Sequence, residues 1–446
     1  MNTSRRSFIK HASLGLAAPL ILKSSLFGRN SKSPNEIVNV GVIGLGQMTW
    51  GHMGFLIHSP RCRLTAICDV DRHRIEFMKG FINRNHQNNG KGGEVKTYTD
   101  FRDMLADQSI DAVYIITPDH WHATMSVMAA RAGKHIYCEK PMTFTMEEAR
   151  KVEKAVKESG VAFQVGSQQR SEETFRKAAF LARNGYLGEI KEVYCQLAWS
   201  MAIPQNWKIE ETPDFIDWDM WCGPSPLNPY SNWLLPKIDL NSDAPYNKLF
   251  FPHWRDHIDY GNSNGADWGA HHYDITLWGL GLDGKGPKYM EVTDKGDMPG
   301  SKNWRQYRFI TESGTKIYKG THPDSGREEA GMVTFVGTEG IAGASRGNKF
   351  YGSKAWMSDV RLGDKDIMYP RVHSHHDNFM DAVYNGTKTI APVEAGRSSA
   401  EISIMGNIGF RLGRNLEWDY KKGKFVGDED ANKFLSRPAR DKWALI

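Results

Sequence analysis

The chain has 446 residues, of which 40% are hydrophobic, so it is too long for one ordinary domain and has enough apolar residues for the cores of two. Six of its 57 basic residues and none of its 52 acidic residues precede Glu36, so the remaining 51 basic residues face 52 acidic ones. The chain after residue 36 is therefore nearly neutral, which argues against the basic surface that nucleic-acid binding requires, and no nucleic-acid partner is expected.

The first 33 residues match an export signal. Arg5 and Arg6 form a twin arginine, Phe8 and Lys10 follow at the spacing of a twin-arginine signal, and a modest apolar run comes next. An ordinary amphipathic first helix is the alternative. We expect residues 1–33 to be a twin-arginine signal segment, the protein to be periplasmic, and no stable membrane insertion after export.

A strand, a glycine turn, a helix and a second strand follow the signal. The run "EIVNVGVIG", residues 36–44, is β-branched and apolar and ends in the turn. Residues 51–59 continue as a helix, and "RLTAICD", residues 63–69, is a buried strand that ends in Asp69. This order gives a glycine motif the context of a dinucleotide-binding site, although Thr49 occupies the place of the third glycine.

Each residue of this motif suits one part of a dinucleotide. Gly44 permits the tight turn, and Gly46 lets the backbone approach a pyrophosphate at the N-terminus of the helix. Asp69 is placed to bind the adenosine ribose hydroxyls and to repel a 2′-phosphate, which predicts NAD as the cofactor. Arg72 and Arg74 follow closely, so NADP remains the less favoured alternative.

Strands and helices then alternate, which predicts a parallel sheet with ligands at the carboxyl ends of its strands. We expect a Rossmann domain over residues 36–165. Motifs fall at three strand ends: "TPDHWH" from Thr117 to His122, "CEKP" from Cys138 to Pro141, and "GSQQR" from Gly166 to Arg170. The strands are expected at 111–118, 134–141 and 161–166, and the helices at 122–133 and 145–160.

Beyond residue 166 the pattern changes to strands of alternating polarity with few helices between them. This pattern predicts a largely antiparallel sheet that is covered on one face, in a second, α+β domain over residues 166–446. The expected fold class is therefore α/β, with a Rossmann domain followed by an α+β domain that has a large open sheet. The strands are expected in residues 189–199, 288–294, 304–312, 315–320 and 331–340.

At "CEKPMT", residues 138–143, the chain resembles the Gfo/Idh/MocA family of glucose–fructose oxidoreductase and inositol dehydrogenase, and the resemblance covers almost everything after residue 33. It implies that Lys140 assists proton transfer at a substrate hydroxyl and that Glu139 lies near the nicotinamide ribose. It also implies that the second domain is an open sheet that carries the substrate. A surface lysine in a strand-to-helix turn is the alternative for Lys140.

The stretch "GADWGAHHYDITLWGL" has the family's spacing of an aspartate and a histidine four residues apart. On a helix these positions share a face, so Asp267 is expected to orient His271. By resemblance His271 is the general base and Asp267 its partner; a helix-capping aspartate beside a core histidine is the alternative.

The resulting site has three groups of residues. The catalytic residues are expected to be Lys140, His271 and Asp267. The cofactor is expected to contact Gly44, Gly46, Gln47, Met48, Asp69, Thr117, Pro118, His122, Glu139, Lys140 and Gln168. The substrate is expected to contact Trp121, Arg170, Asp267, His271 and His272.

No metal site is expected. The histidines near 253–272 and 373–376 lack acidic or thiolate ligands at fixed spacing. The five cysteines form no C-x-x-C pair, and buried free thiols are the preferred interpretation for them.

The function predicted from these features is NAD-dependent oxidation or reduction at a secondary hydroxyl of a sugar or glycoside, with a small-molecule carbohydrate as the partner. We expect a tightly held, internally recycled cofactor and a homo-oligomer formed through the C-terminal sheet. Two alternatives stay open. One is an NAD-dependent glycosidase that works by transient oxidation and elimination, and the other is a non-catalytic protein that binds sugar and NAD.

Overall fold

The structure is a computed structural model that describes residues 37–90, 93–197, 207–238, 252–296, 306–323, 332–360, 366–367, 369–444 and 446. The predicted twin-arginine segment, residues 1–33, lies outside the described residues. Within the described part, no helix combines the length and the apolar character needed to cross a membrane.

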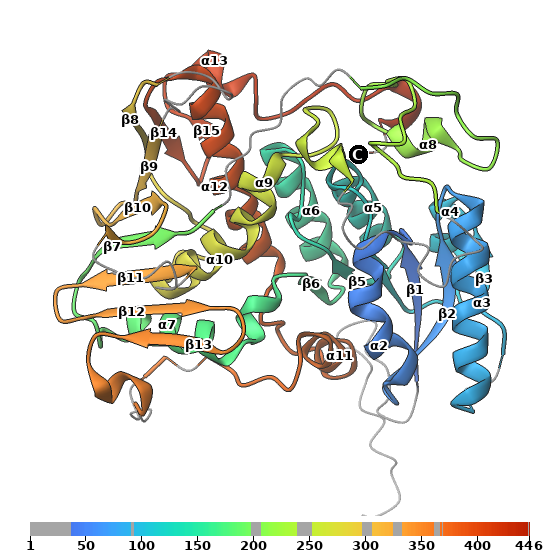
Figure 1. The fold of residues 1–446 in the computed structure, drawn as a ribbon, viewed down its shortest axis with the longest axis horizontal. Helices are drawn as coiled ribbons and strands as arrows, with labels where there is room; N and C mark the ends of the chain where they lie inside the picture. The colour runs from blue at the N-terminus through green and yellow to red at the C-terminus, as the bar shows by residue number, and fades with distance from the viewer. Residues whose placement is uncertain are drawn as a thin grey trace, which may run out of the picture.

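A six-stranded parallel sheet occupies the first part of the chain, with its strands in the order β3-β2-β1-β4-β5-β6 (Figure 1). This is the order of the doubly wound dinucleotide-binding fold, as the sequence predicted. The middle strands are almost entirely buried, which is why most of their residues are apolar. The strands are β1 (Val38–Ile43), β2 (Cys62–Cys68), β3 (Lys96–Tyr98), β4 (Ala112–Ile115), β5 (His135–Cys138) and β6 (Phe163–Val165).

Helices connect these strands. The last of them begins with a capping box, in which the Thr145 hydroxyl accepts from the Glu148 N–H and the Glu148 carboxylate accepts from the Thr145 N–H. It ends at Gly160 in the left-handed conformation, so both ends match the predicted ones within a residue. The helices are α2 (Trp50–His58), α3 (Arg72–Asn88), α4 (Phe101–Ala106), α5 (Asp119–Arg131) and α6 (Met146–Ser159).

A nine-stranded sheet forms the second part, in the order β13-β12-β11-β7-β10-β9-β8-β14-β15. All neighbouring strands are antiparallel except β7 and β10, so the predicted, mostly antiparallel sheet is confirmed. The strands are β7 (Ile190–Cys195), β8 (Tyr289–Asp294), β9 (Gln306–Ile310), β10 (Lys316–Lys319), β11 (Val333–Gly337), β12 (Ile341–Ser345), β13 (Lys349–Gly352), β14 (Leu416–Asp419) and β15 (Lys424–Phe425).

Three helices pack on this sheet and bury its apolar side chains: α7 (Glu173–Arg183), α10 (Gly269–Leu280) and α12 (Val393–Leu412). Helix α12 also packs against α6 and so joins the two sheets into one body (Figure 1). The remaining helices are α8 (Trp218–Cys222), α9 (Ser263–Asp267), α11 (His375–Asn385) and α13 (Glu429–Asn432). All five cysteines are buried and free, as predicted.

Residues 207–238, which include α8, leave the second sheet and lie beside the carboxyl ends of β1, β2 and β4 (Figure 1). They have a hydrophobic cluster of their own, separate from those of the two sheets. The sequence analysis assigned no structure to this segment.

Candidate active site

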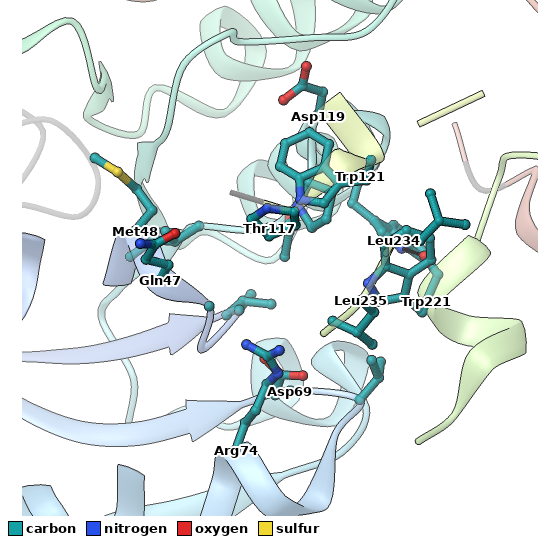
Figure 2. Close-up of a pocket in the computed structure, with 18 of the residues that line it drawn as sticks. Gln47, Met48, Asp69, Arg74, Thr117, Asp119, Trp121, Trp221, Leu234 and Leu235 are labelled. Atoms are coloured by element: carbon teal, nitrogen blue, oxygen red, sulfur yellow. Dashed lines mark hydrogen bonds between the residues drawn. The ribbon is translucent and has the colours of Figure 1, made fainter. Parts of the chain in front are cut away.

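A cavity of about 510 Å³ lies between the glycine turn, the carboxyl ends of the parallel strands and residues 207–238 (Figure 2). It is lined by most of the residues predicted to contact a cofactor, and by others that the sequence analysis did not assign. The predicted residues among its lining are Gly44, Gly46, Gln47, Met48, Asp69, Thr117, Pro118, Trp121, Glu139, Lys140 and Asp267.

The glycine turn fits a pyrophosphate. Gly44 has φ 92°, and a Cβ there would lie 2.5 Å from the Ile116 carbonyl oxygen, so only glycine is accommodated. A Cβ at Gly46 would meet nothing within 4 Å, so the backbone there borders open space that a phosphate group can fill. The Thr49 hydroxyl donates to the Gly44 carbonyl at 2.7 Å, which explains how the turn tolerates threonine in the place of the third glycine.

Asp69 ends β2 at the edge of the cavity. Its carboxylate accepts from the Leu45 N–H at 2.6 Å and from the Asp71 N–H at 2.9 Å, and so is fixed beside the glycine turn. Burial raises the pKa of Asp69 above its ordinary value. Arg74 donates to the Asp71 carboxylate at 3.1 Å and to the Pro236 carbonyl at 2.5 Å, so its guanidinium is held by groups of the protein itself.

Lys140 and Asp267 meet in the same cavity. The Lys140 ammonium donates to the Asp267 carboxylate at 2.6 Å, and the Arg255 guanidinium lies 3.8 Å from the same oxygen. Burial acts to raise the pKa of Asp267, but the charges of Lys140 and Arg255 hold it below its ordinary value. The bond between Lys140 and Pro141 is cis. The site thus pairs a lysine from the first half of the chain with a carboxylate from the second.

The expected pair of Asp267 and His271 does not form. Helix α9 ends at Asp267, α10 begins at Gly269, and the His271 N–H bonds to the Trp268 carbonyl, so the regular spacing is interrupted between the two side chains. His271 is buried and does not line the cavity, and its Nδ1 has no hydrogen-bond partner among the described residues. Burial lowers the pKa of His271 far below its ordinary value, and the charge of Lys140 lowers it further.

Glu139 is the most enclosed carboxylate of the cavity. Gln168 donates to it at 2.9 Å, the Lys140 N–H donates to it at 3.2 Å, and the His52 ring lies 3.2 Å away. Burial acts to raise the pKa of Glu139, and the contact with His52 holds it below its ordinary value. Gln168 therefore supports Glu139 and does not itself line the cavity.

Arg170 corrects a second prediction. Its guanidinium is almost fully buried and donates to the carboxylates of Asp274, at 2.6 and 2.8 Å, and Asp283, at 2.9 and 2.8 Å. It lies outside the cavity, so it is a structural residue and not a substrate ligand. The sequence placed it correctly at a strand end but gave no sign of its distant carboxylates.

Three further residues have structural contacts. Both ring nitrogens of His122 lie against backbone carbonyls, of Pro141 at 2.7 Å and Thr117 at 2.8 Å, so it supports the turn and does not line the cavity. His272 contacts the Gln196 carbonyl at 2.6 Å and also lies outside the cavity lining. Trp121 does line the cavity, but its indole N–H donates to the carbonyls of Met220 and Trp221.

Sequence reasoning missed several lining residues. Asp119 was quoted within "TPDHWH" but given no role; burial raises its pKa to about 7, and the charge of Asp267 raises it too. Arg255 and Trp254 follow a segment without periodicity, and no motif marked them. The residues from 207–238 that line the cavity are Met220, Trp221, Asn232, Leu234, Leu235, Pro236, Lys237 and Ile238.

Comparison with known proteins finds relatives that match part of this chain in sequence. A scyllo-inositol 2-dehydrogenase (NAD(+)) from Bacillus subtilis (strain 168) is 33% identical over 153 residues, which are 34% of this chain and 42% of the relative. A Glycosyl hydrolase family 109 protein from Shewanella baltica (strain OS185) is 32% identical over 165 residues, which are 33% of this chain and 35% of the relative. The chain thus matches about two fifths or less of the length of these relatives.

Among solved structures, the WlbA dehydrogenase from Bordetella pertussis, in complex with NADH and UDP-GlcNAcA, has a TM-score of 0.58 at 16% identity and covers 87% of this chain and 99% of its own. At that identity the likeness concerns the fold. The Gfo/Idh/MocA oxidoreductase family matches residues 38–167 with its NAD-binding Rossmann fold and residues 194–445 with its C-terminal alpha/beta domain. The chain belongs to the Gfo/Idh/MocA family of oxidoreductases.

Proposed function

We propose that this protein is an exported, NAD-dependent oxidoreductase that acts on a secondary hydroxyl of a sugar or glycoside. The observation that carries the proposal is the contact of 2.6 Å between Lys140 and Asp267, in a cavity that also contains the glycine turn and Asp69. A proton-transfer group and a dinucleotide cradle thereby share one enclosed space. Arg5 and Arg6 support export by the twin-arginine route.

The residues divide the work between binding and proton transfer. Gly44 and Gly46 bring the backbone to the pyrophosphate, and Asp69 binds the ribose. When bound, NAD supplies a hydride acceptor at its nicotinamide. Lys140 donates or withdraws the proton of the substrate hydroxyl, and Asp267 holds its ammonium in place. His271 is neutral at neutral pH because burial lowers its pKa, so it takes part in proton transfer only as a weak base that reaches the substrate hydroxyl from outside the cavity lining.

Replacement of Asp69 by serine is expected to weaken NAD binding and to reduce discrimination against NADP. The carboxylate repels a 2′-phosphate and accepts from ribose hydroxyls, and serine does neither as well. Titration of the cofactor-free protein with each dinucleotide gives the ratio of the two dissociation constants, with Asp103→Ser, an exposed carboxylate on α4, as the control. Tighter binding of NADP than of NAD by the wild type would contradict the assignment of Asp69.

We further expect NAD to co-purify at close to one molecule per chain and to survive dialysis. Twin-arginine export carries folded proteins, and the cytoplasm is where NAD is plentiful, so the cofactor is loaded before export. Nanomolar retention requires about 12 kcal/mol of binding free energy. Acid extraction followed by chromatography measures the bound cofactor. Cofactor-free protein that depends on millimolar added NAD would overturn this expectation and favour a cytoplasmic enzyme.

A glycosidase is the second candidate, favoured by the similarity of up to a third of the chain to Glycosyl hydrolase family 109 proteins. Hydrolysis would then run through transient oxidation of the sugar, elimination of the aglycone, addition of water to the unsaturated ketone and reduction of that ketone. A screen of glycosides and free sugars that follows both ketone formation and released aglycone separates the two functions. Ketone without aglycone supports the dehydrogenase, aglycone without net cofactor reduction supports the glycosidase, and neither product overturns both.

We also propose that copies of the chain associate through the nine-stranded sheet. Side chains that alternate with the buried ones, such as Tyr194, Arg308 and Tyr318, are only partly exposed, and the rings of Tyr194 and Tyr318 stack at 5.0 Å. A sheet face with partly exposed aromatic rings suits a symmetric interface between two copies. Light scattering of the purified protein measures the mass, and a monomer at micromolar concentration would exclude the association.

A further inference from the structure

Residues 207–238, which we call the clasp, form the wall of the cavity opposite the glycine turn. Figure 2 shows Trp221, Leu234 and Leu235 of the clasp across the cavity from Gln47 and Met48. The clasp lies at the middle of the chain, whereas the turn lies close to the start of the described residues. A dinucleotide in the cavity would therefore lie between two segments that are distant in sequence.

The clasp is fixed first to the loop after β2, beside Asp69. The Arg72 N–H donates to the Phe215 carbonyl and the Asp217 N–H donates to the Val70 carbonyl, both at 3.0 Å. The two segments therefore pair like antiparallel strands. The rings of His73 and Phe215 stack with their centroids 3.7 Å apart. Hydrogen bonds from Arg72 to the Asp214 carbonyl and from Arg74 to the Pro236 carbonyl, each 2.5 Å, complete this contact.

A second attachment joins the clasp to the start of α5, on the other side of the cavity. The Trp121 indole N–H donates to the carbonyls of Met220 and Trp221, each at 3.0 Å, and the His120 Nε2 contacts the Trp221 carbonyl at 2.8 Å. A Cβ at Gly223 would lie 2.2 Å from the Trp121 ring, so the chain passes directly over the indole. The clasp thus spans the cavity from β2 to α5.

The C-terminal tail holds the clasp from outside. Arg440 donates to the Asp219 carboxylate at 2.5 Å and to its carbonyl at 2.7 Å, and Lys442 reaches the same carboxylate at 2.8 Å. Figure 1 shows the tail running from α13 to α8. Neither Arg440 nor Asp219 lines the cavity, so the tail acts on the clasp and not on its contents.

The clasp is a packed body. Trp218 and Trp221 stack at 4.4 Å, and Tyr230 meets Trp218 edge to face at 5.1 Å. These rings form a buried cluster with Ile216 and Leu234. Because the clasp has its own core and attachments on both sides of the cavity, displacing it costs several hydrogen bonds together with the exposure of apolar surface.

We propose that the clasp closes the adenosine half of the cofactor site, so that a bound dinucleotide exchanges only when the clasp detaches. The argument for the adenosine half is position: the clasp attaches beside Asp69, the residue expected to bind the ribose of that half. The inference rests on the proposed function in one respect, that the ligand of the cavity is NAD. It makes NAD a resident group of the enzyme and not a substrate that comes and goes.

The experiment measures exchange of bound cofactor in the purified full-length protein. The protein is incubated with an excess of radiolabelled NAD, and bound label is counted over time. A nanomolar Kd with an association rate of about 10⁵ M⁻¹s⁻¹ gives a wild-type half-time of roughly two hours. Arg440→Ala and Phe215→Ala, which loosen the clasp from outside the cavity, are each expected to exchange at least about tenfold faster.

Arg61→Ala is the matched control, because Arg61 is also partly exposed and also pairs with carboxylates. Its partners are Asp377 and Asp381 on α11, far from the clasp in the sequence. It is expected to exchange like the wild type. Wild-type exchange within seconds, equal exchange in all variants, or no uptake of label would overturn the proposal that the clasp controls cofactor exchange. If the clasp variants exchange faster but no carbohydrate is oxidised or cleaved, the clasp stands and the proposed function fails. Two clasp variants are used so that misfolding of one, detected by circular dichroism, leaves a result.

Discussion

Replacement of Lys140 by alanine is expected to lower turnover by about a hundredfold or more, while the protein remains folded and keeps its cofactor. A hundredfold loss corresponds to about 2.7 kcal/mol of transition-state stabilisation. Its physical reason is that Lys140 is a proton-transfer group in the cavity, held by Asp267 at 2.6 Å, and alanine can neither carry the proton nor occupy its place. The measurement is kcat with the carbohydrate found in the glycoside screen.

The control for this loss is Lys151→Ala on α6, which removes an exposed lysine that pairs with Glu147 one turn earlier. It should leave kcat unchanged. The kcat of His271→Ala is expected to fall as far as that of Lys140→Ala if the two groups share one hydroxyl proton. Near-normal turnover in both variants, with folding and cofactor content intact, would contradict the assignment of acid–base chemistry to this pair.

The dinucleotide half of the site was predictable because its determinants are local. A glycine turn needs a strand before it and a helix after it, and an acid at the end of the next strand completes the pattern within thirty residues. Gly44, Gly46 and Asp69 accordingly lie in one cavity. Thr49 shows the limit of a motif, because its hydroxyl closes the turn by a hydrogen bond that no glycine could make.

The partner of Asp267 could not be read from spacing. Helical periodicity brings residues four apart together only when the helix is continuous, and here it is interrupted at Trp268. The strongest contact of Asp267 is therefore with Lys140, 127 positions away in the chain. The contact between Lys140 and Asp267 depends on how the two sheets pack together. A single sequence contains no signal for that packing.

The clasp was missed for a different reason. Residues 207–238 have few regular elements, so no period of two or 3.6 marks them. Their tryptophans give no clear signal either, because an indole in an irregular segment can contact a sugar or pack in a core. The structure assigns Trp218 to a core, and it places Trp221 both in that core and against the cavity.

Replacement of Arg170 by alanine is expected to lower the free energy of unfolding by about 3–5 kcal/mol, because it leaves the buried Asp274 carboxylate and the partly exposed Asp283 carboxylate without their cation. The four hydrogen bonds from the guanidinium to Asp274 and Asp283 join the turn before α7 to α10 and the loop after it. Urea unfolding measures the change. Arg102→Ala, which removes a more exposed arginine from its pair with Asp100, is the control and should cost about 1 kcal/mol or less.

The same variant separates the structural role of Arg170 from the substrate-binding role that its position after β6 suggested. A ligand of the substrate would raise KM when it is removed, and stability would change little. A buried structural arginine gives the opposite result: stability falls, and the fraction that stays folded retains a KM close to the wild type. Folded Arg170→Ala protein with a KM raised tenfold and an unchanged urea midpoint would therefore return Arg170 to the substrate site and contradict its structural role beside Asp274 and Asp283.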